Sequence, residues 1–268
     1  MKNLKFIIVI IFSFLSSSCN LDEDPIFLDS TMYDTPQSAI AALDGIYQRL
    51  TTYDAMERRY WVINGFSGLF ITHRQGNNVN NPHNGNLMAL KPIQDQASEF
   101  YWKGLYAAIA QTNAAIKNIT VVENPTTNDE LLFNDIAGQA YFVRAWAYFD
   151  LTRLFSDIPL WIELADESNL NKAKSTSKEI YAQAISDAQT AANLISGVRG
   201  TGYPKQYAAN MLLAKLYMTL ATNPELRDES LTEMNYWQMA YDEAIKVYGQ
   251  YSLVADYSSI FTDSNENN

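Results

Sequence analysis

Residues 58–92 bring together side chains whose types suit the binding of a sugar or another polar ligand. Tyr60 and Trp61 supply flat aromatic faces, and Arg74, Asn77 and Asn78 supply hydrogen-bond donors close by in the sequence. Ligand sites commonly combine apolar or aromatic walls with a few polar groups that fix the orientation of the ligand. We therefore take these five residues as candidate ligand-binding residues. The alternative at each single position is a buried loop aromatic or a solvated asparagine.

Other kinds of chemistry find little support in the sequence. The histidines, His73 and His83, lack the i, i+4 spacing and the neighbouring ligands of a helical zinc site, so we expect solvated loop side chains and no metal. Gly200 and Gly202 lack the third glycine of a dinucleotide-binding turn, so we expect no cofactor. We expect no enzyme activity, although a pair of distant carboxylates for glycoside hydrolysis is left open.

Cys19 is the only cysteine, and it follows a stretch typical of a secretory signal. Basic residues at positions 2 and 5 precede an apolar run over 6–15, which is too short to span a bilayer but fits a signal-peptide core. We predict a signal peptide over 1–18, a lipid anchor on Cys19, and a lipidated acidic tether over 19–34. The alternative is an ordinary small residue in a cleaved leader.

The composition excludes one broad class of function. The 19 basic and 30 acidic residues give a net charge of −11, whereas nucleic-acid binding requires clustered Lys and Arg. Aromatic residues are abundant, with 17 Tyr, 12 Phe and 5 Trp. We expect most of them to pack in a core that the 47% apolar content can fill.

Helical periodicity predicts an all-α fold in which successive helices stack as antiparallel pairs, like an α-solenoid. Thr35 is the predicted N-cap of a first helix, Thr127 and Thr176 open capping boxes, Pro204 is expected to start a helix buried on most sides, and Gly249 is a predicted C-cap. The helices are expected at about 36–50, 97–119, 127–155, 177–195, 204–220 and 236–248, with a long irregular loop over 58–92 and a short extended run at 160–161.

Arg144 and Arg153 lie within the apolar pattern of the third predicted helix. A charged side chain on such a helix is usually paired or reaches the surface. We therefore interpret both arginines as snorkelling or salt-bridged residues that hold helices together.

Several segments together resemble the SusD/RagB family of outer-membrane nutrient-binding lipoproteins. One of them carries Arg144, Ala145, Tyr148, Phe149, Leu151, Pro159 and Leu160, which match the family pattern RA-x-x-YF-x-L…P-L. The other matching segments are Cys19–Asp22, 39–50, 102–119, 179–181, 208–216 and 237–261.

The resemblance implies a helical, TPR-like domain over 35–268 that is held at the outer membrane, facing the cell exterior. It would capture glycans or peptides as a lid on a SusC-type TonB-dependent transporter. Members of the family are longer, so this chain is expected to lack their C-terminal half. Two other functions remain: a TPR-like helical adaptor that binds only protein partners, and a surface glycan hydrolase.

Overall fold

The structure, a computed structural model, describes residues 33–68, 96–119, 127–166 and 169–262. Within these ranges it is almost wholly helical, apart from a two-stranded antiparallel pair of very short strands. The elements are α2 (Pro36–Leu50), the π-helix η3 (Tyr53–Glu57), α3 (Arg59–Ser67), α5 (Gln96–Ile119), α6 (Thr127–Phe155), β1 (Ile158–Pro159), β2 (Lys174–Ser175), α7 (Ser177–Leu194), α8 (Gln206–Thr222), η4 (Pro224–Leu226), α9 (Glu233–Val247) and η5 (Tyr257–Phe261).

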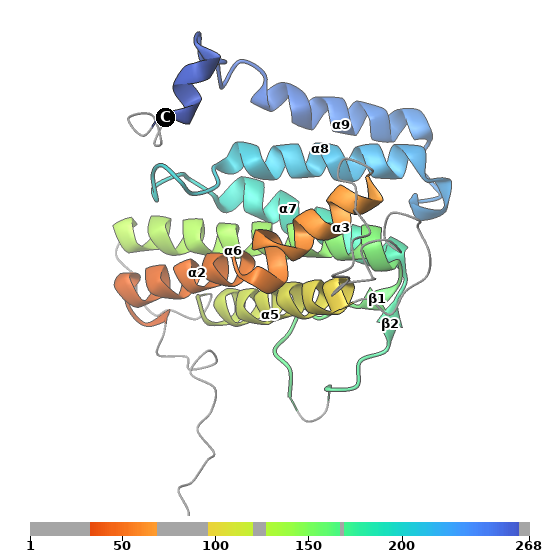
Figure 1. Cartoon of the computed structure of the whole chain (residues 1–268), viewed down its shortest axis with the longest axis horizontal. Helices are drawn as coiled ribbons and strands as arrows, with labels where there is room; N and C mark the ends of the chain where they lie inside the picture. The colour runs from red at the N-terminus through yellow and green to blue at the C-terminus, as the bar shows by residue number, and fades with distance from the viewer. Residues whose placement is uncertain (1–32, 69–95, 120–126, 167–168, 263–268) are drawn as a thin grey trace, which may run out of the picture.

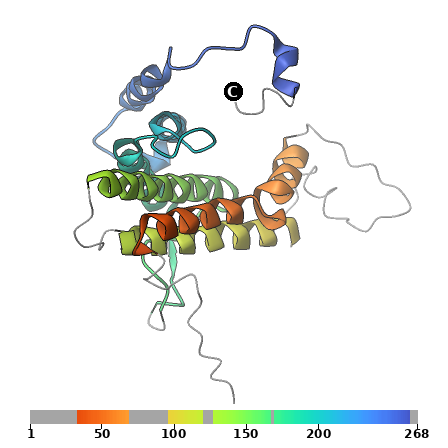
Figure 2. The same cartoon turned by 90° about the vertical axis from the view of Figure 1, so that its left-hand side faces the viewer.

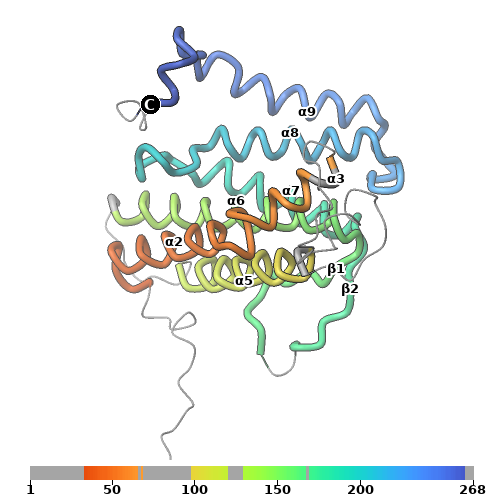
Figure 3. Tube along the Cα trace, viewed as in Figure 1, coloured from red at the N-terminus to blue at the C-terminus, as the bar shows by residue number. Residues whose placement is uncertain are grey.

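Helices that follow one another in the chain also pack against one another. The contacts run from α5 to α6, α7, α8 and α9 in order, while α2 packs against both α5 and α6. Figure 1 shows the long helices as stacked rows, and the trace in Figure 3 runs back and forth between them. The predicted all-α fold of stacked antiparallel helix pairs is confirmed.

Side-chain caps fix several helix ends where the sequence predicts them. The Thr35 hydroxyl accepts a hydrogen bond from the Ser38 amide at the start of α2. At α7, Thr176 and Glu179 form a reciprocal capping box, which satisfies amide groups that have no partner within the helix. Gly249, just beyond α9, has a φ of +79°, as a C-terminal cap requires.

Other predicted ends are shifted. The helix α8 begins at Gln206 after an extended Lys205, two residues beyond Pro204. The helix α9 begins earlier than predicted, at Glu233, because Thr232 caps it through Asn235, and an Asn at this place is a weaker signal than Glu or Gln. The helix α6 starts at Thr127 itself, and the residue before it lies outside the described residues.

The prediction of an irregular loop over 58–92 is wrong for its first part, since Arg59–Ser67 forms α3, directly after the π-helix η3. Ala55 and Ile63 are buried, and both η3 and α3 pack against α5. A β-carbon at Gly104 would lie 2.9 Å from the Asp54 carbonyl oxygen, so this glycine permits the close approach. Tertiary packing of this kind stabilises short helices that local sequence does not specify.

Arg144 joins α6 to α7 through a buried ion pair with Asp187, as predicted, and it also donates to Asn113 Oδ1 on α5 over 2.8 Å. Arg153 does not join helices. Its guanidinium lies 3.6 Å from Asp150 on the same helix and is half exposed. The prediction of a salt-bridged or snorkelling Arg153 is therefore confirmed, but its ion pair lies within α6 and does not hold two helices together.

The short strands lie beside the predicted extended run at 160–161 rather than on it. Ile158 pairs with Ser175, and Pro159 pairs with Lys174. Trp161 is held instead by the Tyr148 hydroxyl, which donates to its carbonyl oxygen and accepts from its amide, each over 2.7 Å. These bonds keep residues 160–161 out of the sheet.

The burial of α8 on most sides is also overestimated by the sequence. Met211 and Met218 are 39% and 47% exposed because α7 and α9 cover only part of the helix. The outer face of α9 and the residues after it expose many apolar side chains, and Figure 2 shows η5 apart from the helical stack. These exposed residues are Tyr241, Ile245, Tyr248, Tyr251, Leu253, Val254, Tyr257, Ile260 and Phe261.

Candidate functional site

A groove runs between α6 and α8, and we call it the α6–α8 groove. Since α7 packs against both helices while they contact each other little, one face of each stays open and forms a wall. The groove encloses about 580 Å³. Its lining residues are Tyr60 from α3, Phe142, Trp146, Phe149, Asp150 and Arg153 from α6, Ala208, Met211, Leu212, Lys215, Met218, Thr219 and Thr222 from α8, and Trp237 from α9.

Aromatic rings dominate the α6 wall of the groove. Phe142, Trp146 and Phe149 recur at intervals of four and three residues, which places them on one side of the helix. Trp146 and Trp237 are half-buried, and the Trp237 indole donates to Glu233 Oε1 over 3.2 Å. Half-buried rings of this kind offer faces on which a flat apolar surface can stack.

Charged groups lie next to these rings. The Arg153 guanidinium is 5.1 Å from the centre of the Phe149 ring and is also paired with Asp150. Lys215 is exposed on the facing wall. The groove therefore combines stacking faces with cationic hydrogen-bond donors, which can hold the hydroxyl groups of a ligand.

Asp150 is anchored beneath the groove by the buried Tyr101 hydroxyl, which donates to its carboxylate. Burial raises the pKa of Asp150, and the hydrogen bond from Tyr101 and the nearby Arg153 only partly offset this effect. Burial also raises the pKa of Tyr101, so its hydroxyl stays protonated and keeps donating. This pair fixes the α6 wall against α5.

The structure brings two of the predicted ligand residues together. Tyr60 is half-buried and lines one end of the groove, with its ring 6.3 Å from Tyr101. Trp61 is 63% exposed and lies edge to face with Tyr60, at 5.5 Å and 86°. Arg74, Asn77 and Asn78 lie outside the described residues and stay predictions, as do the interpretations of Cys19, His73 and His83.

Sequence reasoning missed most of the groove. Helical spacing of aromatic residues indicates a core more often than a site, so the sequence does not single out the following groove residues: Trp146, Phe149, Arg153, Lys215 and Trp237. The available signal was the alignment of Phe149 with Arg153 one turn later on the same side of α6. That signal predicts a shared face but does not show that the face stays open.

The described ranges, 33–68, 96–119, 127–166 and 169–262, also bear on metal binding and membrane insertion. In those ranges, His, Cys, Asp and Glu side chains form no group of three or more that could hold a metal ion. None of the helices described is long and apolar enough to cross a membrane.

Comparison with known proteins identifies the wider group. A family model described as "Starch-binding associating with outer membrane" matches residues 29–218. SusD-like protein P2 of Formosa agariphila is 27% identical over 241 residues, which cover 88% of this chain and 46% of that protein. SusD-like protein P25 of the same organism is 25% identical, covering 100% of this chain and 50% of its own. The chain thus spans about half the length of these relatives.

Solved structures show the same fold. A SusD superfamily protein from Bacteroides thetaiotaomicron superposes with a TM-score of 0.63 at 24% identity, over 82% of this chain and 48% of that one. A laminarin-binding SusD-like protein superposes with a TM-score of 0.69 at 20% identity, over 88% of this chain and 50% of its own. Since the family model covers most of the sequence, the chain belongs to the SusD-like family of outer-membrane, starch-binding-associated proteins.

Proposed function

We propose that this protein is a cell-surface lipoprotein that captures a glycan and passes it to a SusC-type TonB-dependent transporter in the outer membrane. The observation that carries the glycan part is the α6–α8 groove, in which Trp146 and Trp237 stand beside Arg153 and Lys215. The family to which the chain belongs is described by starch binding, and one structural neighbour binds laminarin.

The chemistry of the groove favours a neutral glycan over a peptide. A sugar ring presents a flat apolar face to an indole and hydroxyl groups to Arg and Lys donors. A peptide bound in extended form takes its main-chain hydrogen bonds from a sheet edge. The groove walls are helices, whose main-chain groups are already bonded within the helix, so they have no such edge to offer.

The anchoring part rests on the sequence around Cys19 and on the outer-membrane association of the family. Acyl chains stabilise membrane attachment by about 0.8 kcal/mol for each buried CH₂ group, and stable attachment requires more than one chain. An anchored capture protein beside a transporter raises the local concentration of its ligand at the entry point.

Calorimetric titration of the purified full chain with laminarin, starch oligosaccharides and mixed peptides tests the glycan part. We expect glycan binding without product release, and Trp237→Ala should weaken it by about tenfold through the loss of a stacking face. The matched control is Tyr241→Ala, which removes an aromatic ring one turn further along α9 but outside the groove. Equal weakening by both substitutions would place the ligand elsewhere, and release of sugar products would favour a hydrolase.

The transporter part needs a separate experiment. When outer membranes are cross-linked and this protein is purified from them, we expect a TonB-dependent transporter to be recovered with it. Recovery of protein partners together with an absence of glycan binding would favour a helical adaptor instead.

A further inference from the structure

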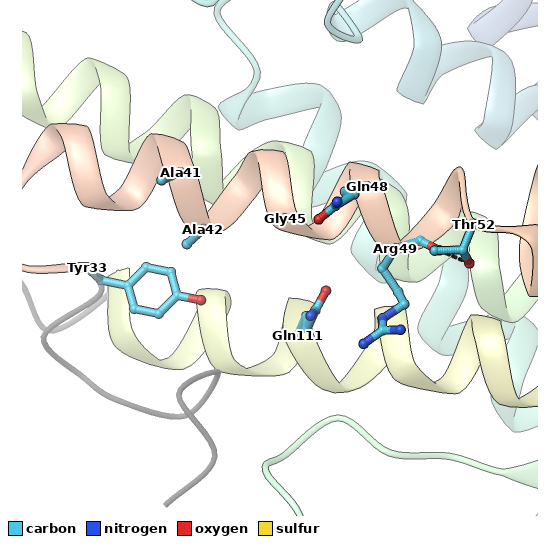
Figure 4. Close-up of a pocket in the computed structure, with 8 residues that line it drawn as sticks. All are labelled: Tyr33, Ala41, Ala42, Gly45, Gln48, Arg49, Thr52 and Gln111. Carbon is cyan, nitrogen blue, oxygen red and sulfur yellow. Dashed lines mark hydrogen bonds between the residues drawn. The ribbon is translucent and has the colours of Figure 1, made fainter.

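A second cavity lies between α2 and α5, away from the α6–α8 groove, and encloses about 330 Å³. Figure 4 shows Arg49 reaching from α2 toward α5, and Gln111 reaching from α5 toward α2. The α2 side is formed by small residues, and a β-carbon at Gly45 would meet nothing within 4 Å. Its full lining is Tyr33, Ala41, Ala42, Gly45, Gln48, Arg49, Thr52 and Gln111.

Arg49 supplies positive charge to this cavity. Arg144 and Arg199 are paired with Asp187 and Asp44, but Arg49, although half-buried, has no carboxylate within ion-pair distance among the described residues. A guanidinium presents a planar set of donors that matches a carboxylate in two parallel hydrogen bonds. The cavity therefore holds the cationic half of an ion pair.

Gln111 supplies a polar group in need of a partner. Its Oε1 atom is buried and accepts no hydrogen bond from the part of the chain that the structure describes. Figure 4 shows this oxygen directed from α5 toward α2, where a hydroxyl group of a ligand can donate to it. Buried acceptors are nearly always satisfied in folded proteins, so an unsatisfied one at a cavity wall indicates a missing donor.

Tyr33 closes one end of the cavity. Only 3% of the residue is exposed, and burial raises the pKa of its hydroxyl to about 12, so the group is protonated and able to donate. In Figure 4 its ring lies flat along the cavity with the hydroxyl directed toward Gln111. The ring itself is packed in the core, and the hydroxyl is the group of Tyr33 that can contact a ligand.

The lining also limits the class of ligand. Among the described residues, no acidic side chain lines the cavity, which argues against amino acids and peptide amino termini as ligands. The volume is near the lower end of the range for small-molecule sites, about 300–1,000 Å³, so a single ring fits better than a chain. The net charge of −11 disfavours a polyanion and leaves a singly charged ligand.

We propose that this cavity binds a sugar acid, that is, a sugar ring bearing one carboxylate. Arg49 holds the carboxylate, Gln111 and Gln48 bond to the ring hydroxyls, and the Tyr33 hydroxyl lies at one end of the cavity. This site is separate from the α6–α8 groove, so it stands whether or not glycans bind there.

The test is a calorimetric titration of the purified full chain with glucuronate and, as the neutral counterpart, with glucose. Glucuronate should bind more tightly than glucose, and Arg49→Gln should weaken its binding on the order of tenfold to a hundredfold. The matched control is Arg58→Gln, which removes the same charge from an exposed arginine outside the cavity and should leave binding unchanged.

A second variant separates loss of binding from loss of folding. Gly45→Leu fills the cavity from α2 while keeping the helix, so it should abolish glucuronate binding with an unchanged circular dichroism spectrum. Three results overturn the proposal: equal affinity for glucose and glucuronate, equal weakening by Arg58→Gln, or full binding by Gly45→Leu.

Discussion

The Arg144 guanidinium on α6 and the Asp187 carboxylate on α7 meet in two parallel hydrogen bonds. Nε lies 2.7 Å from Oδ2, and Nη2 lies 2.8 Å from Oδ1. Both side chains are almost fully buried, and Gln183 donates to the same carboxylate over 2.9 Å. The third nitrogen of the guanidinium, Nη1, donates to Asn113 Oδ1 on α5 over 2.8 Å and to the Ile162 carbonyl oxygen over 3.3 Å. One ion pair thus connects three successive helices of the stack.

Breaking this pair on one side should be costly. Arg144→Met leaves a buried, unpaired Asp187 and should lower the free energy of unfolding by about 3–5 kcal/mol. The double variant Arg144→Met/Asp187→Leu removes both charges and should recover much of that loss. Urea unfolding of the parent, the two single variants and the double variant measures the coupling energy between Arg144 and Asp187. Strictly additive effects would show that the pair contributes little as a unit.

Asp150 should make stability depend on pH. Burial raises its pKa above the ordinary value of 3.8, so the folded protein keeps this proton to a higher pH than the unfolded chain. Protonated Asp150 therefore contributes stability at low pH. This contribution is lost as the pH rises from about 3.8 through the pKa of Asp150 in the folded protein, and above that pKa the loss stays constant.

Asp150→Asn keeps an acceptor for the Tyr101 hydroxyl but cannot ionise. Unfolding free energies of the variant and the parent, measured across the acidic range, should diverge as pH rises, with the parent falling relative to the variant. Parallel curves would contradict the expected role of Asp150.

Two helical glycines should respond to the same substitution in opposite ways. Gly45→Ala places its β-carbon in open space and should stabilise α2 by about 0.5–1 kcal/mol. A β-carbon at Gly138 would lie 2.9 Å from the Ile195 amide nitrogen and from Leu194 Cβ, so Gly138→Ala should destabilise by about 1–3 kcal/mol. Thermal unfolding measures the stability change in each variant. Stability changes of the same sign in the two variants would contradict the surroundings described for these glycines.

Trp61 should matter for ligand and not for folding. It is 63% exposed, so Trp61→Ala should change the free energy of unfolding by no more than about 0.5 kcal/mol. Its place beside Tyr60, at the end of the groove, leads us to expect weaker glycan binding in the same variant. Unchanged affinity in titrations would remove Trp61 from the site.

Cys19 should decide membrane attachment. Cys19→Ala removes the thiol that would carry the acyl chains, so it should abolish labelling by fatty-acid analogues and release the protein from membranes. Ser17→Ala, a small substitution in the same stretch, should change neither. Retention of the label in Cys19→Ala would show that the anchor lies elsewhere.

The helical stack was predictable because its signals are local. Thr176 and Glu179 mark a helix start within four residues, and buried apolar residues recur at helical spacing from Ile136 to Leu151 in α6. The groove was not predictable in the same way. Phe142, Trp146 and Phe149 show the spacing of buried residues, and only the placement of α7 leaves that face of α6 open.

The helical structure of α3 could not be predicted from the sequence, for a related reason. Its residues lack strong helical periodicity, and their helical form depends on packing against α5, which lies far away in the sequence. The partner of Arg153 was equally hidden, since Asp150 on its own helix and an acid on a neighbouring helix are indistinguishable in sequence.

The position of α9 has a consequence for the order in which the structure opens. Its main partner is α8, whereas α6 packs against α2, α5 and α7 and is tied by Arg144 to two of them. In a linear stack, each helix is protected chiefly by its neighbours. Amide hydrogens of α9 should therefore exchange with solvent through low-energy local opening, while those of α6 should exchange only through global unfolding.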